Sequence, residues 1–496
     1  MSQRPVPTET QTQARVWWVL AILLGLRLIS LGLYPLMDNT EARYAEISRV
    51  MGVLGDWVTP WYDTGVPFWG KPPLSFWTTV LSFGLLGVNE FAARLPHFLA
   101  ALGVGWLVWG WARQRSQPAA LTAVALLAGC SLMLISAGAV MTDMTLLVGI
   151  TLAMRGFWLG LHGDTTQRQR EGWLFFLGLT IGLLAKGPLV LVLAGLPLGL
   201  WTLFNWQWGR VWRHLPWLRG SLAVLLLVGP WYAVAELRTP GFLDYFLLGE
   251  HWHRFVTPGW TGDRYGVAHS APWGSIWVYA AVAMLPWSLL VPLAWWRWRT
   301  AGVAAQPVAA SDKPLQHYLI LWSLAPALFF TFAGNILWTY ALPALPPLAL
   351  LGAAWLTRHA DQRRVNRLLT LGLILSAVLF AGFVASLNLK QTEDWHTTQR
   401  LVAHYDTLNS QQRALIFYPE RPYSAAFYSR GRAEQIAQAS TLLTRLAGQP
   451  AFLAVETTAV ATLPAAVRAH VQWQGQHGDY TLFLITDLSV RDQAID

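Results

Sequence analysis

The chain has 496 residues, 54% of them hydrophobic, with 30 Trp and only 12% charged residues. This much apolar surface cannot be hidden in the cores of ordinary soluble domains, so the composition excludes a typical soluble enzyme and indicates a polytopic membrane protein. The formal charge of +9 does not indicate a nucleic-acid partner, because the basic residues lie in short clusters between apolar segments and not on one soluble face.

Apolar segments of about 20 residues, the length that crosses a bilayer, predict eleven membrane spans in an α-helical fold. We read the first as an uncleaved helix, because it is as long as a full span and lacks a clear small-residue cleavage site. The short fifth segment and its successor are interpreted as a hairpin broken at Lys186-Gly187-Pro188. The segments lie at 16–36, 92–112, 119–139, 143–161, 172–185, 188–206, 219–235, 273–296, 315–334, 340–357 and 367–388.

Lys and Arg collect in alternate connections between these spans, which predicts that those connections face the cytoplasm. With the N-terminus inside, the inner connections hold Arg4, Arg15, Arg113, Arg115, Arg168, Arg170, Arg210, Arg213, Arg219, Arg297, Arg299, Lys313, Arg358, Arg363, Arg364 and Arg367. The outer side then comprises the loop at 37–91, the turn at 140–143, Lys186, the loop at 236–272, Asn335 and the tail from Lys390 onward. These segments together hold most of the acidic residues of the chain.

The first outer loop concentrates ionisable residues in an otherwise apolar chain. Its apolar residues Tyr44, Ile47, Met51 and Leu54 recur at spacings of three and four, which predicts an amphipathic helix on the membrane surface. A second apolar piece runs from 72 to 86. We therefore predict two interfacial helices, joined by the loop GDWVTPWYDTGVPFWGK.

The tail differs in kind from the rest of the chain. It alternates β-rich runs, ALIFY at 414–418, AFLAVE at 451–456 and YTLFLIT at 480–486, with helix-like polar stretches such as 432–447. This pattern predicts a small soluble α/β domain outside the membrane. The expected organisation is a membrane-embedded domain over 1–388 and an α/β domain outside the membrane over 389–496.

Several motifs together resemble one family. The run TEARYAEISRVM, followed by GDWVTP, KPPLSFW and NEFAARLP, is similar to the first outer loop of the GT-C membrane glycosyltransferases that use a polyprenyl-phosphate sugar. Further matches in the same order are MTDMTL at 141–146, LLAKGP at 183–188, FLLGEHWHRF at 246–255 and TYALPALPPLALL at 339–351. Within that family, the motifs resemble those of aminoarabinose transferases acting on lipid A and of bacterial relatives of protein O-mannosyltransferases.

Two positions depart from that family's pattern. Thr40 stands where the family has an Asp directly before the Glu-x-Arg-Tyr run, and the nearest aspartate is Asp38. Gly70 stands where an acidic residue often precedes the lysine of the KPP motif. Roles assigned to those two acids do not carry over to Thr40 and Gly70.

The resemblance implies an inverting glycosyltransferase that moves a sugar from an undecaprenyl-phosphate-type donor to lipid A, a glycan or a protein. The reaction would take place at the periplasmic face of the bacterial inner membrane, in a monomer surrounded by membrane lipids. The alternative is a transporter or a lipid-linked-sugar flippase, but transporters tend to place charges near the bilayer midplane in two related halves. A non-catalytic scaffold would leave the charged first loop unexplained.

An acceptor hydroxyl needs a carboxylate within hydrogen-bond reach to take its proton. The candidates for this base are Asp38 and Asp143, with Glu41 in reserve. Structural roles are the alternative. Asp38 and Glu41 have the spacing of a helix capping box, and Asp143 stands where it could cap the span that follows.

A departing phosphate needs positive charge, because its own negative charge grows as the bond breaks. Lys71, Arg254 and Lys186 are the candidate phosphate ligands, and Tyr340 could donate a hydrogen bond. As alternatives, Arg254 would be an interfacial anchor, Lys186 a lysine that reaches the interface from a broken hairpin, and Tyr340 a member of the aromatic belt.

The remaining candidates, expected to contact the sugar or the acceptor, are Arg43, Tyr44, Glu250 and His251. Arg43 has a local alternative, an ion pair with Glu46 or Glu41. His251, His253 and His269 share one outer loop, but their spacing matches no zinc motif, so no metal site is assigned. No cofactor is assigned either, and a divalent cation stays open.

Overall fold

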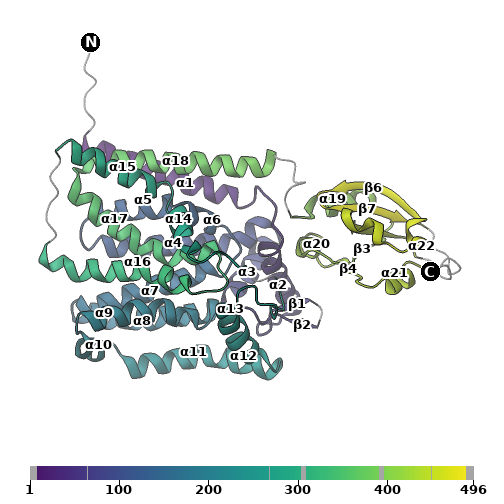
Figure 1. Cartoon of the computed structure of the whole chain (residues 1–496), viewed down its shortest axis with the longest axis horizontal. Helices are drawn as coiled ribbons and strands as arrows, with labels where there is room; N and C mark the ends of the chain where they lie inside the picture. Colours follow the sequence, from purple (N-terminus) through teal and green to yellow (C-terminus); the bar gives the residue numbers. More distant parts are fainter. Residues whose placement is uncertain are drawn as a thin grey trace, which may run out of the picture.

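The computed structural model describes residues 8–63, 65–266, 269–302, 309–389, 396–447 and 449–486. Long helices run side by side along the major axis of the molecule, and the strand-rich tail sits at one end of them (Figure 1). The first outer loop lies at that same end, between the helices and the tail (Figure 1). Arg4 and Lys390, which entered the charge pattern, lie outside the described residues.

The membrane part of the chain is almost entirely helical. Each predicted span coincides with one helix or with two consecutive helices. The helices are α1 (Glu9–Ser30), α2 (Glu41–Leu54), α3 (Leu74–Leu86), α4 (Glu90–Ala112), α5 (Gln117–Gly129), α6 (Ser131–Ser136), α7 (Asp143–His162), α8 (Thr165–Lys186), α9 (Leu189–Phe204), α10 (Trp208–His214), α11 (Trp217–Arg238), α12 (Phe242–Asp244), the π-helix η1 (Tyr245–His253), α13 (Arg254–Val256), α14 (Ser275–Ala283), α15 (Trp287–Thr300), the 3₁₀-helices η2 (Ala310–Asp312) and η3 (Trp338–Ala344), α16 (Lys313–Thr331), α17 (Leu345–His359) and α18 (Gln362–Leu389).

Fewer than eleven of these helices are long and apolar enough to cross a membrane singly. Within the described residues, α1, α4, α7, α11, α18 and the continuous η3–α17 helix qualify, and α14 with α15 forms a seventh candidate bent by 72°. Some of the remaining helices differ in length from the spans predicted for them. The segment predicted at 119–139 breaks at Cys130, and α8 starts at Thr165, seven residues before the predicted 172.

Helices α7 and α8 pack with almost no side chain between them. A Cβ placed on Gly178 would lie 2.5 Å from the carbonyl oxygen of Gly149, and one on Gly149 would lie 2.7 Å from that of Gly178. Small residues that allow such backbone contact are the usual means by which membrane helices associate. The close packing fixes the start of α7, at Asp143, beside the end of α8, at Lys186.

Helices are present at both places predicted in the first outer loop, as α2 and α3. The two-stranded sheet of β1 (Trp61–Asp63) and β2 (Val66–Pro67) lies between them. On α2, Tyr44, Ile47 and Met51 are buried in protein, whereas Leu54, the fourth residue of the predicted apolar face, is exposed. The helix ends at Gly55, whose φ of +64° suits glycine at a helix C-terminus.

The tail folds as a five-stranded mixed sheet with helices on it. The sheet has the order β4-β3-β5-β7-β6, with β3 parallel to β4 and β5, and β7 antiparallel to β5 and β6. The three predicted β-runs are confirmed as β3, β5 and β7. The elements are α19 (Gln399–Leu408), β3 (Ala414–Tyr418), α20 (Tyr423–Tyr428), β4 (Ala433–Gln435), α21 (Ala439–Leu446), β5 (Ala451–Glu456), the 3₁₀-helix η5 (Thr457–Thr462), α22 (Ala465–Arg468), β6 (Val471–His477) and β7 (Tyr480–Ile485).

The tail docks on the first outer loop through polar contacts around α20. The hydroxyl of Tyr428 accepts a hydrogen bond of 2.7 Å from the amide of Leu36. Asp38 accepts one from the amide of Ser424, at 2.7 Å, and another from the Ser424 hydroxyl. The capping-box alternative for Asp38 is therefore wrong, because its carboxylate faces the tail. Thr40, at the N-cap of α2, makes no side-chain cap either.

Candidate active site

A polar cavity of about 330 Å³ opens where the first outer loop, the start of α7, the end of α8 and the 236–272 loop meet. Its lining comes from segments that the charge pattern assigns to the outer side. Eight of the eleven candidate residues line it: Arg43, Tyr44, Lys71, Asp143, Lys186, Glu250, Arg254 and Tyr340.

An apolar groove of about 320 Å³ adjoins this cavity. Most of its lining is hydrocarbon, from Pro188, Leu189, Val192, Leu247, Phe255, Phe329 and Phe330. Five charged or polar residues line both the groove and the cavity: Lys71, Lys186, Glu250, Arg254 and Tyr340. The charged groups thus form the boundary between a polar and an apolar space, which suits a molecule with an anionic head and a hydrocarbon tail.

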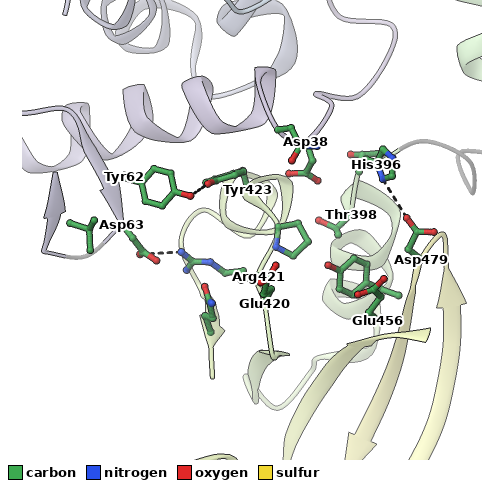
Figure 2. Close-up of a pocket in the computed structure, with 16 residues that line it drawn as sticks. Asp38, Tyr62, Asp63, His396, Thr398, Glu420, Arg421, Tyr423, Glu456 and Asp479 are labelled. Atoms are coloured by element: carbon green, nitrogen blue, oxygen red, sulfur yellow. Dashed lines mark hydrogen bonds and ion pairs between the residues drawn. The ribbon is translucent and has the colours of Figure 1, made fainter. Parts of the chain in front are cut away.

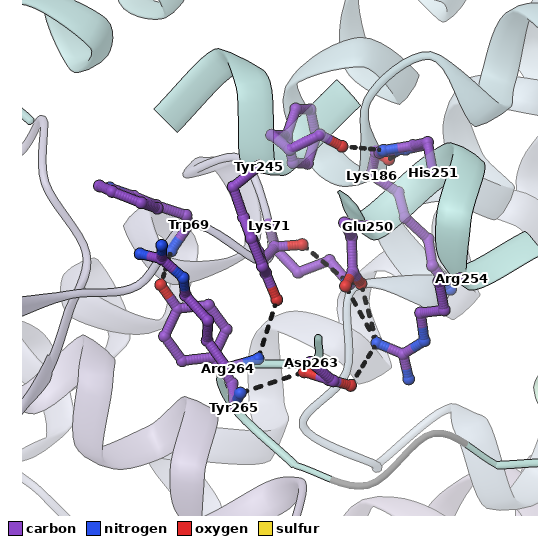
Figure 3. A network of polar contacts seen from close by, with 12 residues as sticks. Trp69, Lys71, Lys186, Tyr245, Glu250, His251, Arg254, Asp263, Arg264 and Tyr265 are labelled. Atoms are coloured by element: carbon purple, nitrogen blue, oxygen red, sulfur yellow. Dashed lines mark hydrogen bonds and ion pairs between the residues drawn. The ribbon is translucent and has the colours of Figure 1, made fainter. Parts of the chain in front are cut away.

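Glu250 stands at the centre of the charged network (Figure 3). Its carboxylate accepts a hydrogen bond from the Lys71 ammonium, and the Arg254 Nη1 lies 3.1 Å and 3.0 Å from its two oxygens. Arg254 also pairs with Asp263 at 3.1 Å. Burial by itself would raise the pKa of Glu250, but Lys71 and Arg254 outweigh it and hold that pKa at about 2.

Local backbone structure places these groups. Lys71 precedes Pro72 and Pro73, which fix the approach of the chain to α3. Glu250 projects from the π-helix η1, a rare form that is often found at functional sites. The Lys71 ammonium donates a second hydrogen bond to the carbonyl of Gly70 at 2.7 Å. A side chain on Gly70 would lie 2.8 Å from the Phe68 ring, so an acidic residue at this position would require that ring to move.

His251 does not line the polar cavity and instead ties η1 to the end of α8. Its Nδ1 lies 2.7 Å from the carbonyl of Phe246 and its Nε2 lies 3.2 Å from the carbonyl of Lys186. Burial lowers the pKa of His251, so the neutral ring donates to one of these two carbonyls. The next residue after Lys186, Gly187, has a φ of +78°, and a Cβ there would lie 2.5 Å from Phe246. Glycine is therefore required at this contact.

Asp143 and Lys186 form an ion pair of 2.7 Å at the wall of the cavity. Their side chains are 8% and 9% exposed, so each charge depends on the other. The Lys186 ammonium also lies 5.0 Å from the centre of the Tyr340 ring, within the range of a cation–π contact. The pair joins a candidate base to a candidate phosphate ligand.

Two of the three candidate bases lie outside the cavity. Glu41 pairs with Arg94 at 2.8 Å and accepts a hydrogen bond from the amide of Val140 at 3.2 Å. It therefore supports the turn that precedes Asp143. Asp38 faces Ser424. Of the three carboxylates, Asp143 alone lines the polar cavity.

Arg43 reaches across the cavity instead of pairing within its own helix. Its Nη1 donates to the carbonyl of Tyr265. Glu46 pairs with Arg49 at 2.6 Å, and Glu41 pairs with Arg94 at 2.8 Å. The local ion pair considered for Arg43 is therefore wrong, and its guanidinium connects α2 to the 236–272 loop.

The cavity wall also holds charged and aromatic residues that the sequence analysis did not name as candidates. Asp263 and Tyr265 come from the 236–272 loop, and Glu420 and Tyr423 come from the tail. No motif or spacing pointed to them, because each reaches the cavity only through long-range packing. Within the part of the chain that the structure describes, no three His, Cys, Asp or Glu side chains are grouped to hold a metal ion.

A second polar cavity, of about 590 Å³, lies between the first outer loop and the tail (Figure 2). Arg421 pairs with Asp63 at 3.1 Å, and the hydroxyls of Tyr62 and Tyr423 are in contact. Asp38 lies on its wall. Burial raises the pKa of Asp38 to about 6, although the hydrogen bonds from Ser424 act in the opposite direction. This cavity forms part of the interface that docks the tail.

Comparisons with known proteins show which families and folds this chain resembles. The model of the dolichyl-phosphate-mannose-protein mannosyltransferase family matches residues 16–246. The chain is 33% identical, over 75% of its length and 66% of the relative's, to an undecaprenyl phosphate-alpha-4-amino-4-deoxy-L-arabinose arabinosyl transferase of Pseudomonas paraeruginosa. It is 34% identical, over 65% of its length and 56% of the relative's, to the enzyme of that name from Erwinia tasmaniensis.

The fold matches a solved structure over nearly its whole length. The crystal structure of ArnT from Cupriavidus metallidurans bound to undecaprenyl phosphate superposes with a TM-score of 0.79 at 19% identity. The match covers 96% of this chain and 98% of that one. At this identity the likeness shows a common fold. The chain spans 66% and 56% of the length of the two curated relatives named above.

Proposed function

The chain belongs to the GT-C membrane glycosyltransferases of the aminoarabinose transferase and protein mannosyltransferase type, and on that premise we propose that it transfers a sugar from a polyprenyl-phosphate donor. The observation that carries the proposal is the set of cations shared by the polar cavity and the apolar groove. A polyprenyl-phosphate sugar has its phosphate between a sugar and a hydrocarbon chain. The cavity would hold the sugar, the cations would bind the phosphate, and the groove would hold the hydrocarbon chain.

The donor phosphate binds to Lys71 and Arg254 in this proposal. Arginine contacts phosphate oxygens in a planar fork, and lysine adds a compact charge. Lys186 and Tyr340 lie on the same boundary and complete the anionic site. The first isoprene units lie along Leu189, Phe255 and Phe329, and the rest of the hydrocarbon chain continues into the bilayer.

Asp143 is the proposed base. The acceptor oxygen attacks the anomeric carbon of the sugar, and its proton passes to the Asp143 carboxylate. The bond between the anomeric carbon and the phosphate oxygen breaks, and its electron pair stays on that oxygen. Lys71 and Arg254 stabilise the negative charge that grows there. Direct attack from the opposite side inverts the anomeric centre.

The sugar and the acceptor are proposed from the relatives. The curated relatives are named for 4-amino-4-deoxy-L-arabinose, so an amino sugar of this type is the first donor to test. Asp263 and Glu420 on the cavity wall would suit its ammonium group. Lipid A is the first acceptor to test, followed by a glycan or a protein.

The proposed location is the periplasmic face of the bacterial inner membrane, with the N-terminus in the cytoplasm. In this arrangement residues 1–388 form the catalytic membrane domain, and 389–496 form a periplasmic domain that contributes Glu420 and Tyr423 to the cavity wall. The cavity lies at the helix ends and not at their midpoints, which favours a transferase over a transporter.

Mass spectrometry of lipid A and envelope glycoproteins from cells with and without this protein tests the proposal. A transferase adds the mass of one sugar to an acceptor only in cells that contain it, and the substitution Arg254→Ala removes that mass. If no acceptor mass depends on the protein in cells that make a polyprenyl-phosphate sugar, the proposed function is wrong.

A further inference from the structure

The cations of the phosphate site already have carboxylate partners in the structure. Lys71 faces Glu250, Arg254 faces both Glu250 and Asp263, and Lys186 faces Asp143. These three cations and three carboxylates cancel in formal charge. An anion that enters the site therefore meets a neutral cluster and not a bare pocket of positive charge.

Glu250 holds the central place in that cluster. Both of its oxygens lie against Arg254, at 3.1 Å and 3.0 Å, and one of them also accepts from Lys71. Its side chain is 7% exposed, so little water screens its charge. A phosphate that binds Lys71 and Arg254 together must lie beside this carboxylate or push it aside.

The two lipid phosphates of the reaction differ in charge. The donor is a phosphodiester with one negative charge, whereas the polyprenyl phosphate that leaves is a monoester with a charge of about −1.5 to −2 at neutral pH. A fixed negative charge repels a second charge in proportion to the magnitude of that charge. Glu250 therefore weakens the binding of the product more than the binding of the donor.

We propose that Glu250 is a built-in counter-ion that makes the phosphate site release the dianionic lipid product in preference to the monoanionic donor. This inference rests on the proposed function. Glu250 touches the phosphate ligands Lys71 and Arg254 and acts through its charge on whichever phosphate they hold. Product release limits many enzymes, so a residue that speeds the departure of a lipid anion raises turnover.

A purely structural role for Glu250 predicts a different outcome. If the carboxylate only held Lys71 and Arg254 in place, its loss would weaken the binding of both lipid phosphates to the same extent. The ratio of the two affinities would then stay constant. The charge role changes that ratio, so the two explanations separate in a binding experiment.

The test measures equilibrium binding of undecaprenyl phosphate and of its methyl ester to the full-length protein in nanodiscs at pH 8. The methyl ester is a phosphodiester and carries the single charge of the donor. We expect Glu250→Gln to tighten binding of the monoester about tenfold more than binding of the methyl ester. Glu250→Asp keeps the charge and should keep the wild-type ratio. Glu236→Gln is the matched control. The Glu236 carboxylate accepts hydrogen bonds from the backbone amides of Gly241 and Leu243, and it does not contact Lys71 or Arg254.

Turnover gives the second measurement. With Glu250→Gln, the first turnover should not slow, whereas steady-state turnover should fall and added undecaprenyl phosphate should inhibit more strongly. If Glu250→Gln does not fold, Glu250→Met removes the charge without needing a hydrogen-bond partner and is used in its place.

The outcomes separate this inference from the proposed function. An unchanged affinity ratio in Glu250→Gln or Glu250→Met overturns the counter-ion role and leaves the transferase proposal standing. If the wild-type protein binds neither lipid phosphate, the proposed function fails, and the counter-ion role fails with it.

Discussion

Asp143 and Lys186 are in contact at 2.7 Å although 43 residues separate them in the chain. One is the first residue of α7 and the other is the last residue of α8. The glycine contacts between these antiparallel helices bring the two ends together, and burial makes each charge depend on the other. Helix packing in the membrane thus sets the position of the proposed base.

Asp143→Asn should abolish most sugar transfer. The amide cannot take a proton from the acceptor, and loss of a general base typically lowers a rate about 100- to 10,000-fold. The donor phosphate keeps its ligands Lys71 and Arg254, so the loss should appear in kcat and not as weaker donor binding. The measurement is kcat of the purified variant with a lipid-linked amino sugar and lipid A.

Asp38→Asn serves as the comparison for that variant. Asp38 lies against Ser424 and not on the wall of the polar cavity, so this substitution should leave kcat within a factor of about two to three, since acid–base roles are limited to groups within hydrogen-bond reach. Wild-type transfer by Asp143→Asn, or loss of transfer by Asp38→Asn, would show that the base has been assigned to the wrong aspartate.

Lys71→Ala should weaken donor binding. It removes a charged hydrogen-bond donor worth about 1.5–3 kcal/mol, which corresponds to a loss of about ten- to a hundredfold in kcat/KM for the donor. Lys71→Arg should retain part of the activity, because it keeps the charge. Lys313→Ala, at the cytoplasmic end of α16 in the proposed topology, is the control. Equal kcat/KM values for Lys71→Ala and wild type would remove Lys71 from the site.

Gly178→Ala should separate α7 from α8. The added Cβ would lie 2.5 Å from the Gly149 carbonyl and the Ala153 amide nitrogen, and overpacking of this kind costs about 1–3 kcal/mol. The shift moves Asp143 away from Lys186, so transfer should fall together with thermal stability. Gly199→Ala is the matched control, because nothing lies within 4 Å of a Cβ built there. Equal stability and activity of the two variants would contradict this account of the helix contact.

The docking of the tail should weaken as pH rises. Burial raises the pKa of Asp38 from 3.8 to about 6 in the folded protein, so the folded state binds a proton more tightly than the unfolded chain does. This contribution to stability is fully present below pH 3.8 and is lost as pH rises through about 6. Its size is on the order of 3 kcal/mol.

Hydrogen exchange, corrected for the intrinsic rate, measures this effect at the amides of Asp38 and Ser424. Protection should be higher at pH 5 than at pH 8, and Asp38→Asn, which has no charge to lose, should remove the difference. Equal protection of the wild-type amides at both pH values would mean that Asp38 does not control docking.

Local sequence patterns were enough to predict the apolar helices, the two helices of the first outer loop and three strands of the tail. The spacing of Tyr44, Ile47 and Met51 predicted α2, and the alternating apolar runs of the tail predicted β3, β5 and β7. Both patterns record which face of an element is buried, and that information is local. The lengths of the spans were predicted less well, because the break at Cys130 follows no apolar or charge signal.

The partners of the charged residues could not be predicted in the same way. Lys71 and Glu250 are 179 residues apart, and Asp38 and Ser424 are 386 residues apart. Only the packing of whole elements brings them together. For the same reason, Asp38 was included among the candidate bases, although it lies where the tail docks on the first outer loop. No sequence pattern indicated Asp263 and Glu420.

The most direct test of the proposed donor site is a structure of the protein in nanodiscs with undecaprenyl phosphate. We predict density for the phosphate between Lys71 and Arg254, with the hydrocarbon chain in the groove along Leu189, Phe255 and Phe329. An apolar groove of about 350 Å³ between α1 and α4 offers the lipid another place to bind. If the lipid occupied that groove, with its phosphate away from Lys71 and Arg254, the proposed donor site would be wrong.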